Sequence, residues 1–306
     1  MLTLDGVSKV YKVGAFGGTE LPAVRDVSFT IAPGEVVSLI GESGSGKSTI
    51  GKMILRLIGI NGGIITLGDT NVATLKGAAL RDYYREVQGV FQDPFSSCNP
   101  IFKVEHIFSL VRGVYFHSLS GAEWRSKVAE ALGAVALEPG QVLHKYPHQL
   151  SGGQLQRLLV ARALLLDTKI LVADEIISML DASTRIDVLN LLGELKSRGL
   201  GILFITHDLS LGNYISEKTV ILRRGRVVEM GETSKVFGNP THPYTRMLIA
   251  AVPQLHKRWG DEAVADPGPC RVHAASPSGP AGSALLVEVE PDHSVACFRI
   301  DEGVPC

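Results

Sequence analysis

The sequence is poor in cysteine, and it has no long hydrophobic run. Its 306 residues include 4 cysteines, none spaced as Cys-x-x-Cys, so no zinc site is readable. No apolar run reaches the roughly 18 residues that are needed to cross a bilayer. The opening residues, MLTLDGVSKVYK, lack an apolar core of signal-peptide length. We therefore expect a protein that is made and kept in the cytosol, where disulfide frameworks are rare.

An excess of charge of one sign is also absent. The chain carries 30 basic and 31 acidic residues, which gives a formal net charge of −1. Nucleic-acid-binding domains usually have a clear basic excess, so this balance argues against a nucleic-acid partner. A hydrophobic content of 45% and a charged content of 20% are typical of a globular protein.

Apolar residues follow two different patterns along the chain. Residues 2–31 alternate apolar and polar side chains, which predicts antiparallel strands. Three later runs are continuously apolar, as in strands that are buried on both faces: VVSLI (36–40), ILVA (170–173) and GILFIT (201–206). Helix-like segments separate these runs, so we expect a mostly parallel α/β sheet. Ligands of such sheets bind beyond the carboxyl ends of the strands, where all three runs place polar residues.

Two segments depart from this alternation. Residues 94–160 are helical in pattern without buried strands, and they include a capping box at Ser120 and Glu123. We interpret this segment as a helical insertion. From about residue 256 the chain is rich in Pro, Gly, Ala and Ser, which is typical of a flexible or loosely packed tail. We therefore divide the chain into a domain of residues 1–255 and a tail of residues 256–306.

The stretch GESGSGKST, residues 41–49, matches the phosphate-loop pattern G-x-x-x-x-G-K-[ST]. Glycines let backbone N–H groups turn inward around phosphate oxygens, and a following helix adds a favourable dipole. That helix is indicated by apolar residues at helical spacing: Ile50, Met53, Ile54 and Leu57. Lys47 is expected to reach the β- and γ-phosphates, and Ser48 to bind Mg²⁺. A glycine-rich surface turn is the alternative, but the strand and helix flanks argue against it.

Polar residues end the later strands. An aspartate such as Asp174, beside a phosphate loop, usually holds Mg²⁺. Glu175 follows it and could polarise the attacking water as a general base. Without the loop, this pair would be interpreted as charges at a helix start. His207 ends the third run and is a candidate γ-phosphate contact, although a structural histidine is the common alternative. Gln92 follows another short apolar run, and by itself it does not indicate a functional role.

A second helix start carries two adjacent glycines, in LSGGQLQR, residues 150–157. Ser151 and Gln154 satisfy a capping box, which does not explain Gly152 and Gly153. Glycines there expose N–H groups at the positive end of a helix, which predicts a second anion site. Either the chain binds two anions, or two chains share one nucleotide.

The ordered set of motifs resembles the ATP-binding-cassette (ABC) ATPases over about residues 2–253. The motifs are GESGSGKST, VFQDP, LSGGQLQR, ILVADE, SMLD and ITHD. The resemblance implies an α/β P-loop NTPase fold. Its parts would be an N-terminal antiparallel β subdomain, a RecA-like parallel-sheet core and an inserted helical subdomain. It also implies hydrolysis of ATP with Mg²⁺.

The resemblance assigns a nucleotide site. Tyr11 would stack on the adenine ring. Mg²⁺ would be bound by Ser48, Gln92 and Asp174. The phosphates would be cradled by residues of the loop: Gly41, Ser43, Gly44, Ser45, Gly46, Lys47, Ser48 and Thr49.

Catalytic and dimer roles follow in the same way. Glu175 would be the catalytic base and His207 the γ-phosphate sensor. Gln92 would contact Mg²⁺ or the attacking water and sense the membrane subunits. Asp181 would lie in the loop that crosses the dimer. The family usually has DEPTSALD where this chain has DEIISMLD, but the acid pair is intact, so we expect hydrolysis.

Cassettes of this family pack head to tail. Residues of the signature would therefore close over the nucleotide of a partner chain: Ser151, Gly152, Gly153 and Gln154. This arrangement explains a glycine helix start so far from the phosphate loop. Gly153→Asp is expected to fold normally and to fail in closing over the partner's nucleotide.

The segment NPTHPYTRMLIAAVP, residues 239–253, resembles ATP subunits of oligopeptide, dipeptide and nickel importers. The resemblance implies two integral membrane permease subunits, an extracytoplasmic solute-binding protein and a second ATPase subunit, in a heterodimer or a homodimer. The chain would lie peripherally at the cytoplasmic face of the inner membrane. Oligosaccharides or nickel chelates are the alternative solutes.

Two other classes remain as alternatives. A soluble ABC ATPase without a transporter typically has two cassettes in one chain or a long coiled-coil insertion, and this sequence has neither. A generic nucleotide-binding enzyme such as a kinase would not carry LSGGQ.

Many importer subunits of this kind end in a four-cysteine tail that resembles an iron–sulfur site. Here Cys270 and Cys297 are retained, and Cys306 lies past the usual pattern. Four cysteines normally hold such a cluster, so the tail is expected to bind no complete one. Iron and sulfide analysis after anaerobic purification is expected to give far less than one cluster per chain. Four irons per chain, lost in a Cys270→Ser variant, would contradict this interpretation.

Overall fold

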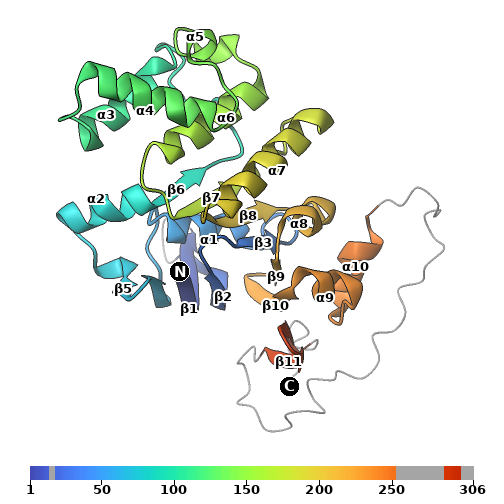
Figure 1. The fold of residues 1–306 in the computed structure, drawn as a ribbon. Coiled ribbons are helices and arrows are strands. Elements are labelled where there is room, and N and C mark those ends of the chain that lie inside the picture. Colours follow the sequence, from blue (N-terminus) through green and yellow to red (C-terminus); the bar gives the residue numbers. More distant parts are fainter. Residues whose placement is uncertain (14–17, 253–285, 298–306) are drawn as a thin grey trace. The chain divides into compact units, whose positions relative to one another are not determined.

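The computed structural model describes residues 1–13, 18–252 and 286–297 (Figure 1). The chain divides into two compact units, Met1–Thr74 with Leu203–Cys306 and Leu75–Ile202. The chain passes from the second unit back to the first within strand β8 (Gly201–Thr206). No helix in the described ranges combines the length and apolar character that crossing a bilayer requires.

The first unit contains an antiparallel sheet, in the order β2-β1-β4-β5. Its strands are β1 (Leu2–Val13), β2 (Thr19–Ile31), β4 (Gly62–Leu67) and β5 (Thr70–Asn71), and a 3₁₀ turn, η1 (Val72–Thr74), follows. Leu2 and Leu4 are buried on one face of β1, and they pair with Ile31 and Phe29. This sheet confirms the antiparallel strands that the alternating pattern predicted.

The second sheet of this unit runs in the order β11-β12-β10-β9-β3-β8. Its other strands are β3 (Val36–Ile40), β9 (Lys218–Arg223), β10 (Arg226–Glu232), β11 (Val287–Glu290) and β12 (His293–Val295). Every residue of β3 and β8 is buried, as their continuous apolar runs predicted. β3 and β9 are parallel, so the α/β expectation is confirmed.

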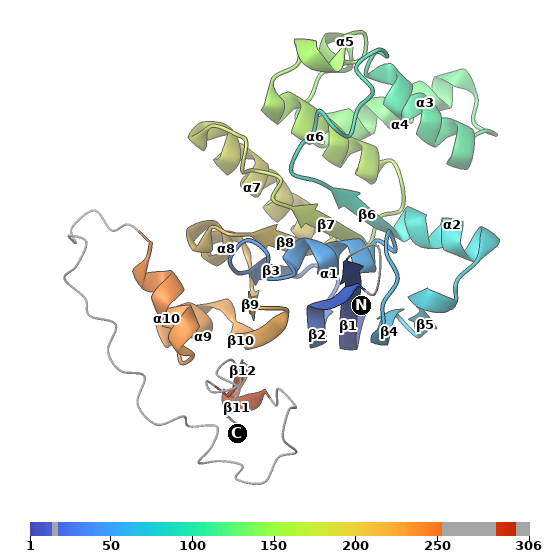
Figure 2. The ribbon, with the colours of Figure 1, turned by 180° about the vertical axis from the view of Figure 1, so that it is seen from behind.

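The described part of the first unit contains four helices: α1 (Lys47–Ile54), α8 (Leu209–Ile215), α9 (Thr233–Gly238) and α10 (Pro243–Ala250). In both views, α9 and α10 lie beside β10 (Figure 1, Figure 2). This places the segment that resembles peptide importers at the same sheet that carries the phosphate loop after β3.

The first helix is shorter than its apolar spacing predicted. It ends at Ile54, and Leu57 is 58% exposed. Arg56 adopts φ 52°, the N–H of Leu57 donates to the carbonyl of Lys52, and the N–H of Arg56 donates to that of Met53. This is a Schellman termination, which stops the helix before the last apolar position. The prediction was therefore wrong for Leu57.

Part of the tail forms strands that the sequence analysis did not identify. β11 and β12 pair antiparallel, and β12 pairs antiparallel with β10. Val295 and Cys297 are buried there. The remaining tail, including Cys270 and Cys306, lies outside the described residues.

The second unit combines two parallel strands with helices. β6 (Val87–Val90) and β7 (Ile170–Asp174) pair in parallel. The helical elements are α2 (Gly77–Glu86), α3 (Glu105–Tyr115), α4 (Gly121–Gly133), α5 (Pro139–Val142), η2 (Pro147–Gln149), α6 (Gly152–Leu164) and α7 (Ala182–Ser197). Residues 94–160 contain helices and no strand, as predicted, and the capping box of Ser120 and Glu123 is present.

Candidate nucleotide-binding site

The loop between β3 and α1 needs its glycines. Gly44 and Gly46 adopt φ 81° and 108°, a region that favours glycine. A Cβ on Gly41 would lie 2.1 Å from the carbonyl oxygen of Leu222, and one on Gly46 would lie 2.5 Å from that of Ala23. The loop is therefore wound tightly against neighbouring backbone, and side chains at these positions would force it open.

A buried ammonium group lies inside this loop. Lys47 is 5% exposed, and its Nζ donates to the carbonyl oxygens of Gly41 at 2.7 Å and Glu42 at 2.9 Å. The hydroxyl of Ser45 is buried and has no hydrogen-bond partner among the described residues. A buried polar group without a partner is costly. A buried cation and an unsatisfied hydroxyl in one loop fit an anionic ligand such as a phosphate.

The other predicted residues of the first unit lie on β1 and after β8. His207 follows β8 and is exposed, and the next residue, Asp208, caps α8. Tyr11 pairs with Leu21 on β2 and is half-buried, with the Lys9 ammonium 5.4 Å from its ring centroid. These positions leave both side chains open to solvent at least in part.

In the second unit, the acid pair follows β7. Asp174 is the last residue of the strand and is 7% exposed. Glu175 adopts φ 50°, and its carbonyl oxygen accepts hydrogen bonds from the Ser178 N–H at 3.1 Å and the Ser178 hydroxyl at 2.9 Å. Left-handed backbone is uncommon in residues other than glycine, and such strain clusters at functional sites. Ser178 therefore holds the strained turn at Glu175.

The departure from the family pattern after the acid pair has a structural reason. Ile176 and Ile177 are only 1% and 2% exposed, so they anchor the turn in the core. The Arg185 guanidinium donates to the carbonyl oxygens of Leu180 and Ser178, at 2.8 Å and 3.3 Å. Apolar burial and one arginine therefore fix this turn.

Asp181 caps the N-terminus of α7, a role that the sequence analysis did not identify. Its carboxylate caps α7 by accepting hydrogen bonds from the Thr184 N–H at 3.0 Å, the Thr184 hydroxyl at 2.8 Å and the Ser183 hydroxyl at 2.6 Å. The Ser183 hydroxyl and the Thr184 donors hold the pKa of Asp181 well below its usual range. An aspartate just before the helical pattern was the signal for this cap.

The signature helix α6 begins at Gly152 with the predicted capping box. The Ser151 hydroxyl accepts from the Gln154 N–H at 3.2 Å, and the Gln154 side chain accepts from the Ser151 N–H at 3.1 Å. The N–H groups of Gly152 and Gly153 are at the first helical positions and have no acceptor within the helix. The cap therefore leaves these two donors for a ligand.

The two signature glycines also have a packing role. A Cβ on Gly153 would lie 2.2 Å from Cγ2 of Thr184, whereas one on Gly152 would lie 3.4 Å from Cδ2 of Leu180. Thr184 is short, branched and bound to Asp181, so it cannot move away cheaply. The expectation that Gly153→Asp folds normally was therefore wrong, and Gly152 is the better position for a probe.

The signature helix also supports the strand before Gln92. Gln156 is fully buried and donates from Nε2 to the carbonyl oxygen of Phe91 at 3.5 Å. The Arg162 guanidinium donates to the carbonyl oxygen of Gly89 at 3.1 Å, and burial lowers its pKa. Gln92 is exposed immediately after this supported segment. Sequence spacing did not reveal these contacts.

The predicted Mg²⁺ ligands are oxygen donors: the Ser48 hydroxyl, the Gln92 amide and the Asp174 carboxylate. Ser48 belongs to the first unit, and the other two belong to the second. No group of three or more His, Cys, Asp or Glu suited to a metal occurs in the part of the chain that the structure describes. Mg²⁺ is usually held by one or two carboxylates together with substrate phosphates. Each of these oxygen donors is of a type that suits Mg²⁺, with nucleotide phosphates supplying further oxygens.

The chain is similar to known ATP-binding transport proteins. The ABC transporter family matches residues 24–178, and the C-terminal region of oligopeptide/dipeptide transporters matches residues 228–279. The glutathione import ATP-binding protein GsiA of Salmonella typhimurium is 40% identical over 282 residues. A Brucella ovis protein described as a peptide import ATP-binding protein is 38% identical over 315 residues.

The extent of these matches differs. The alignment with GsiA covers 90% of this chain but only 44% of GsiA, so the chain spans less than half of that relative. The Brucella match covers 98% of both chains. Among solved structures, the ATP-binding cassette MJ0796, a dimer in a post-hydrolysis state with ADP and Pi, superposes with a TM-score of 0.68 at 30% identity. That match covers 76% of this chain and 99% of the cassette. The chain belongs to the ABC transporter family of ATP-binding proteins.

Proposed function

We propose that this chain binds and hydrolyses ATP to power an importer of oligopeptides or dipeptides. The observation that carries the proposal is the phosphate loop, in which a buried ammonium and an unsatisfied buried hydroxyl lie in a glycine-bounded turn. In this proposal, Lys47 also donates to the β- and γ-phosphates. The inward N–H groups of the loop bind the remaining phosphate oxygens. Tyr11 would stack on the adenine ring.

In this proposal, the second unit supplies the catalytic base, and the first unit supplies a γ-phosphate contact. Ser48, Asp174 and Gln92 would hold Mg²⁺, which would neutralise charge on the phosphates. Glu175 accepts a proton from the attacking water, and its strained backbone fixes the direction of the carboxylate. His207 contacts the γ-phosphate and orients it.

The signature acts on a partner's nucleotide. The free N–H groups of Gly152 and Gly153 and the Ser151 hydroxyl would bind the γ-phosphate held by another cassette, and Asp181 would lie at that dimer boundary. The dimeric MJ0796 structure with ADP and Pi supports this arrangement. We infer a heterodimer with a second ATPase subunit, with a homodimer as the alternative.

The names of the relatives support import of peptides. The Brucella relative is named for peptide import and the Salmonella relative for glutathione import, and glutathione is a small peptide. We infer two membrane permease subunits and an extracytoplasmic solute-binding protein as partners. The chain would then lie peripherally at the cytoplasmic face of the membrane. Oligosaccharides and metal chelates are the alternative solutes, and binding assays on the solute-binding protein distinguish them.

Lys47→Ala is expected to reduce ATP binding to near the detection limit. Hydrogen bonds to charged groups contribute roughly 1.5–3 kcal/mol each, and the backbone N–H groups alone do not replace the ammonium charge. Titration of the purified chain with a fluorescent ATP analogue measures the loss, and Lys52→Ala, on the same helix, is the control. Wild-type affinity in Lys47→Ala would refute the loop assignment.

Glu175→Gln is expected to bind ATP normally, to stop phosphate release and to abolish peptide uptake. The amide cannot accept the proton of the attacking water, while the phosphate loop is unchanged. Steady-state phosphate release by the assembled transporter and uptake of labelled dipeptide by cells measure the two effects. Unchanged phosphate release would mean that another group activates the water. Loss of hydrolysis with normal dipeptide uptake would refute the transport role.

Gly152→Asp tests the signature in trans, because a Cβ fits at this position. A carboxylate about 4 Å from a phosphate in a partly dry interface is repelled by about 4 kcal/mol at an effective dielectric of 20. This corresponds to roughly a thousand-fold loss of dimer closure. The expected result is normal ATP binding at the chain's own loop, with loss of turnover at the partner's loop. Labelling each loop with an azido-ATP analogue follows the two sites separately.

Gly121→Asp is the matched control for this variant. Gly121 also follows a serine that forms a capping box, at the first position of α4. An aspartate there suits the positive end of a helix, so turnover is expected to be unaffected. Equal effects of the two variants, or a defect of Gly152→Asp at its own loop, would contradict binding in trans.

A further inference from the structure

A residue outside the proposed nucleotide site hydrogen-bonds the phosphate loop. Tyr244 lies on α10, in the segment that resembles peptide importers, and is 3% exposed. Its phenol oxygen accepts a hydrogen bond from the backbone N–H of Glu42 at 3.0 Å. Glu42 is the second residue of the loop, so α10 contacts the loop directly. Both residues belong to the first compact unit.

This contact acts on the same peptide group that binds Lys47. The carbonyl oxygen of Gly41 accepts from the Lys47 ammonium at 2.7 Å, and the N–H of the same peptide donates to Tyr244. The carbonyl and the N–H of a trans peptide point in opposite directions. Tyr244 therefore helps to keep the carbonyl edge of this peptide toward Lys47.

The ring of Tyr244 is fixed by its surroundings. It belongs to a buried cluster that also contains Ile40, the last residue of β3, and Ile221 of β9. The Arg223 guanidinium lies 5.0 Å from the ring centroid. Burial raises the pKa of the phenol, so the hydroxyl stays protonated at neutral pH. The hydroxyl is therefore held at one place beside the loop.

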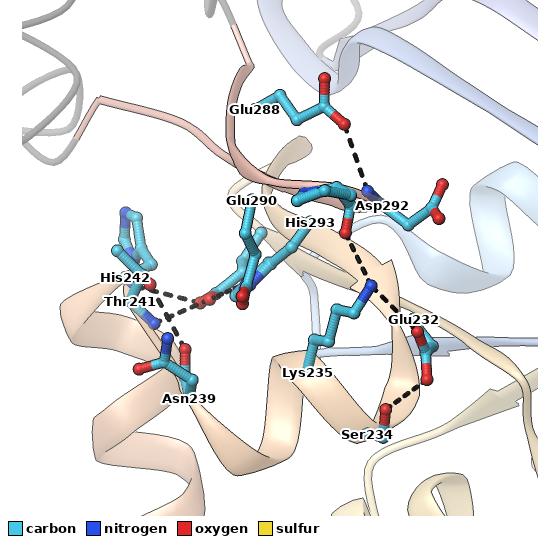
Figure 3. A network of polar contacts seen from close by, with 12 residues as sticks. Glu232, Ser234, Lys235, Asn239, Thr241, His242, Glu288, Glu290, Asp292 and His293 are labelled. Carbon is cyan, nitrogen blue, oxygen red and sulfur yellow. Dashed lines mark hydrogen bonds and ion pairs between the residues drawn. The ribbon is translucent and has the colours of Figure 1, made fainter.

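The start of α10 is anchored by a buried carboxylate. Glu229 of β10 is fully buried, and its oxygens accept from the N–H groups of Thr241 at 2.8 Å and His242 at 3.0 Å. One of these oxygens also lies 2.8 Å from Nε2 of His293, whose Nδ1 lies 2.8 Å from Glu290 (Figure 3). The hairpin of β11 and β12 is thus tied to the residues that precede α10.

His242 completes the anchor. Its Nδ1 accepts the N–H of Tyr244 at 3.1 Å and so caps the helix. Burial, followed by the nearby Arg223 charge, lowers the pKa of His242 to about 4. The ring is therefore neutral at physiological pH, and Nδ1 remains an acceptor. The cap holds the backbone of Tyr244 while the hydrophobic cluster holds its ring.

We propose that Tyr244 is a positioning residue for the phosphate loop, and that its hydroxyl holds the Gly41–Glu42 peptide in the orientation that nucleotide binding requires. The proposal rests on the proposed role of the loop in ATP binding. Without the hydroxyl, the loop spends more time in other conformations, and the apparent dissociation constant rises as the competent fraction falls. Loss of one neutral hydrogen bond predicts roughly three- to ten-fold weaker ATP binding.

The test compares Tyr244→Phe with Thr245→Val. Thr245 is the next residue on α10, is fully buried, and has a hydroxyl without a hydrogen-bond partner among the described residues. ATP affinity, the KM and kcat for ATP, and hydrogen–deuterium exchange of the Glu42 amide are measured for both variants and for the wild-type chain. Tyr244→Phe is expected to bind ATP about three- to ten-fold more weakly, through KM rather than kcat, and to exchange the Glu42 amide faster. Thr245→Val is expected to leave all of these unchanged.

Three results would overturn the proposal. They are wild-type affinity in Tyr244→Phe, equal loss in Thr245→Val, and rapid exchange of the Glu42 amide in the wild-type chain. The last measurement stands even if the variants fold poorly. The Lys47→Ala titration separates failure of the proposed Tyr244 role from failure of the loop assignment. If Lys47→Ala loses ATP while Tyr244→Phe does not, only the role of Tyr244 fails. If Lys47→Ala retains ATP, the loop assignment fails.

Discussion

The buried ammonium of Lys47 is the interaction on which the phosphate loop depends. It is held by carbonyl oxygens of the loop's first two residues, within a turn that only glycines allow at Gly41 and Gly46. Carbonyl oxygens accept hydrogen bonds from this ammonium, and a buried cation beside a glycine loop suits an anionic ligand. The strand β3, the helix α1 and the contact of Tyr244 all constrain the same few peptide groups. The loop is therefore shaped before any nucleotide arrives, which reduces the cost of ordering it on binding.

In the second unit, the signature residues have two roles at once. The first helical N–H groups of α6 have no acceptor within the helix, because the capping box uses only the N–H of Gln154 and that of Ser151. The glycines keep those donors accessible, and Gly153 also makes room for Thr184. One sequence feature thus serves both anion binding and close packing against α7.

Much of the fold and site could be predicted from the sequence because the signals are local. The buried strands, the phosphate loop, the acid pair after β7 and both capping boxes depend on residues that are near each other in the chain. The missed features depend on long-range contacts. Tyr244 and Glu42 are 202 positions apart, and the packing of Thr184 on Gly153 follows from how α6 meets α7. The hairpin of β11 and β12 forms against β10, across a segment whose composition indicated no structure.

The most direct measurement is the structure of the chain with a non-hydrolysable ATP analogue and Mg²⁺. The account predicts that the Lys47 ammonium contacts the β- and γ-phosphates and that the Glu42 N–H still donates to the Tyr244 hydroxyl. It also predicts that the Ser45 hydroxyl, which is unsatisfied among the described residues, gains a phosphate or water partner. A nucleotide bound elsewhere, with no phosphate contact to the Lys47 ammonium, would contradict the account.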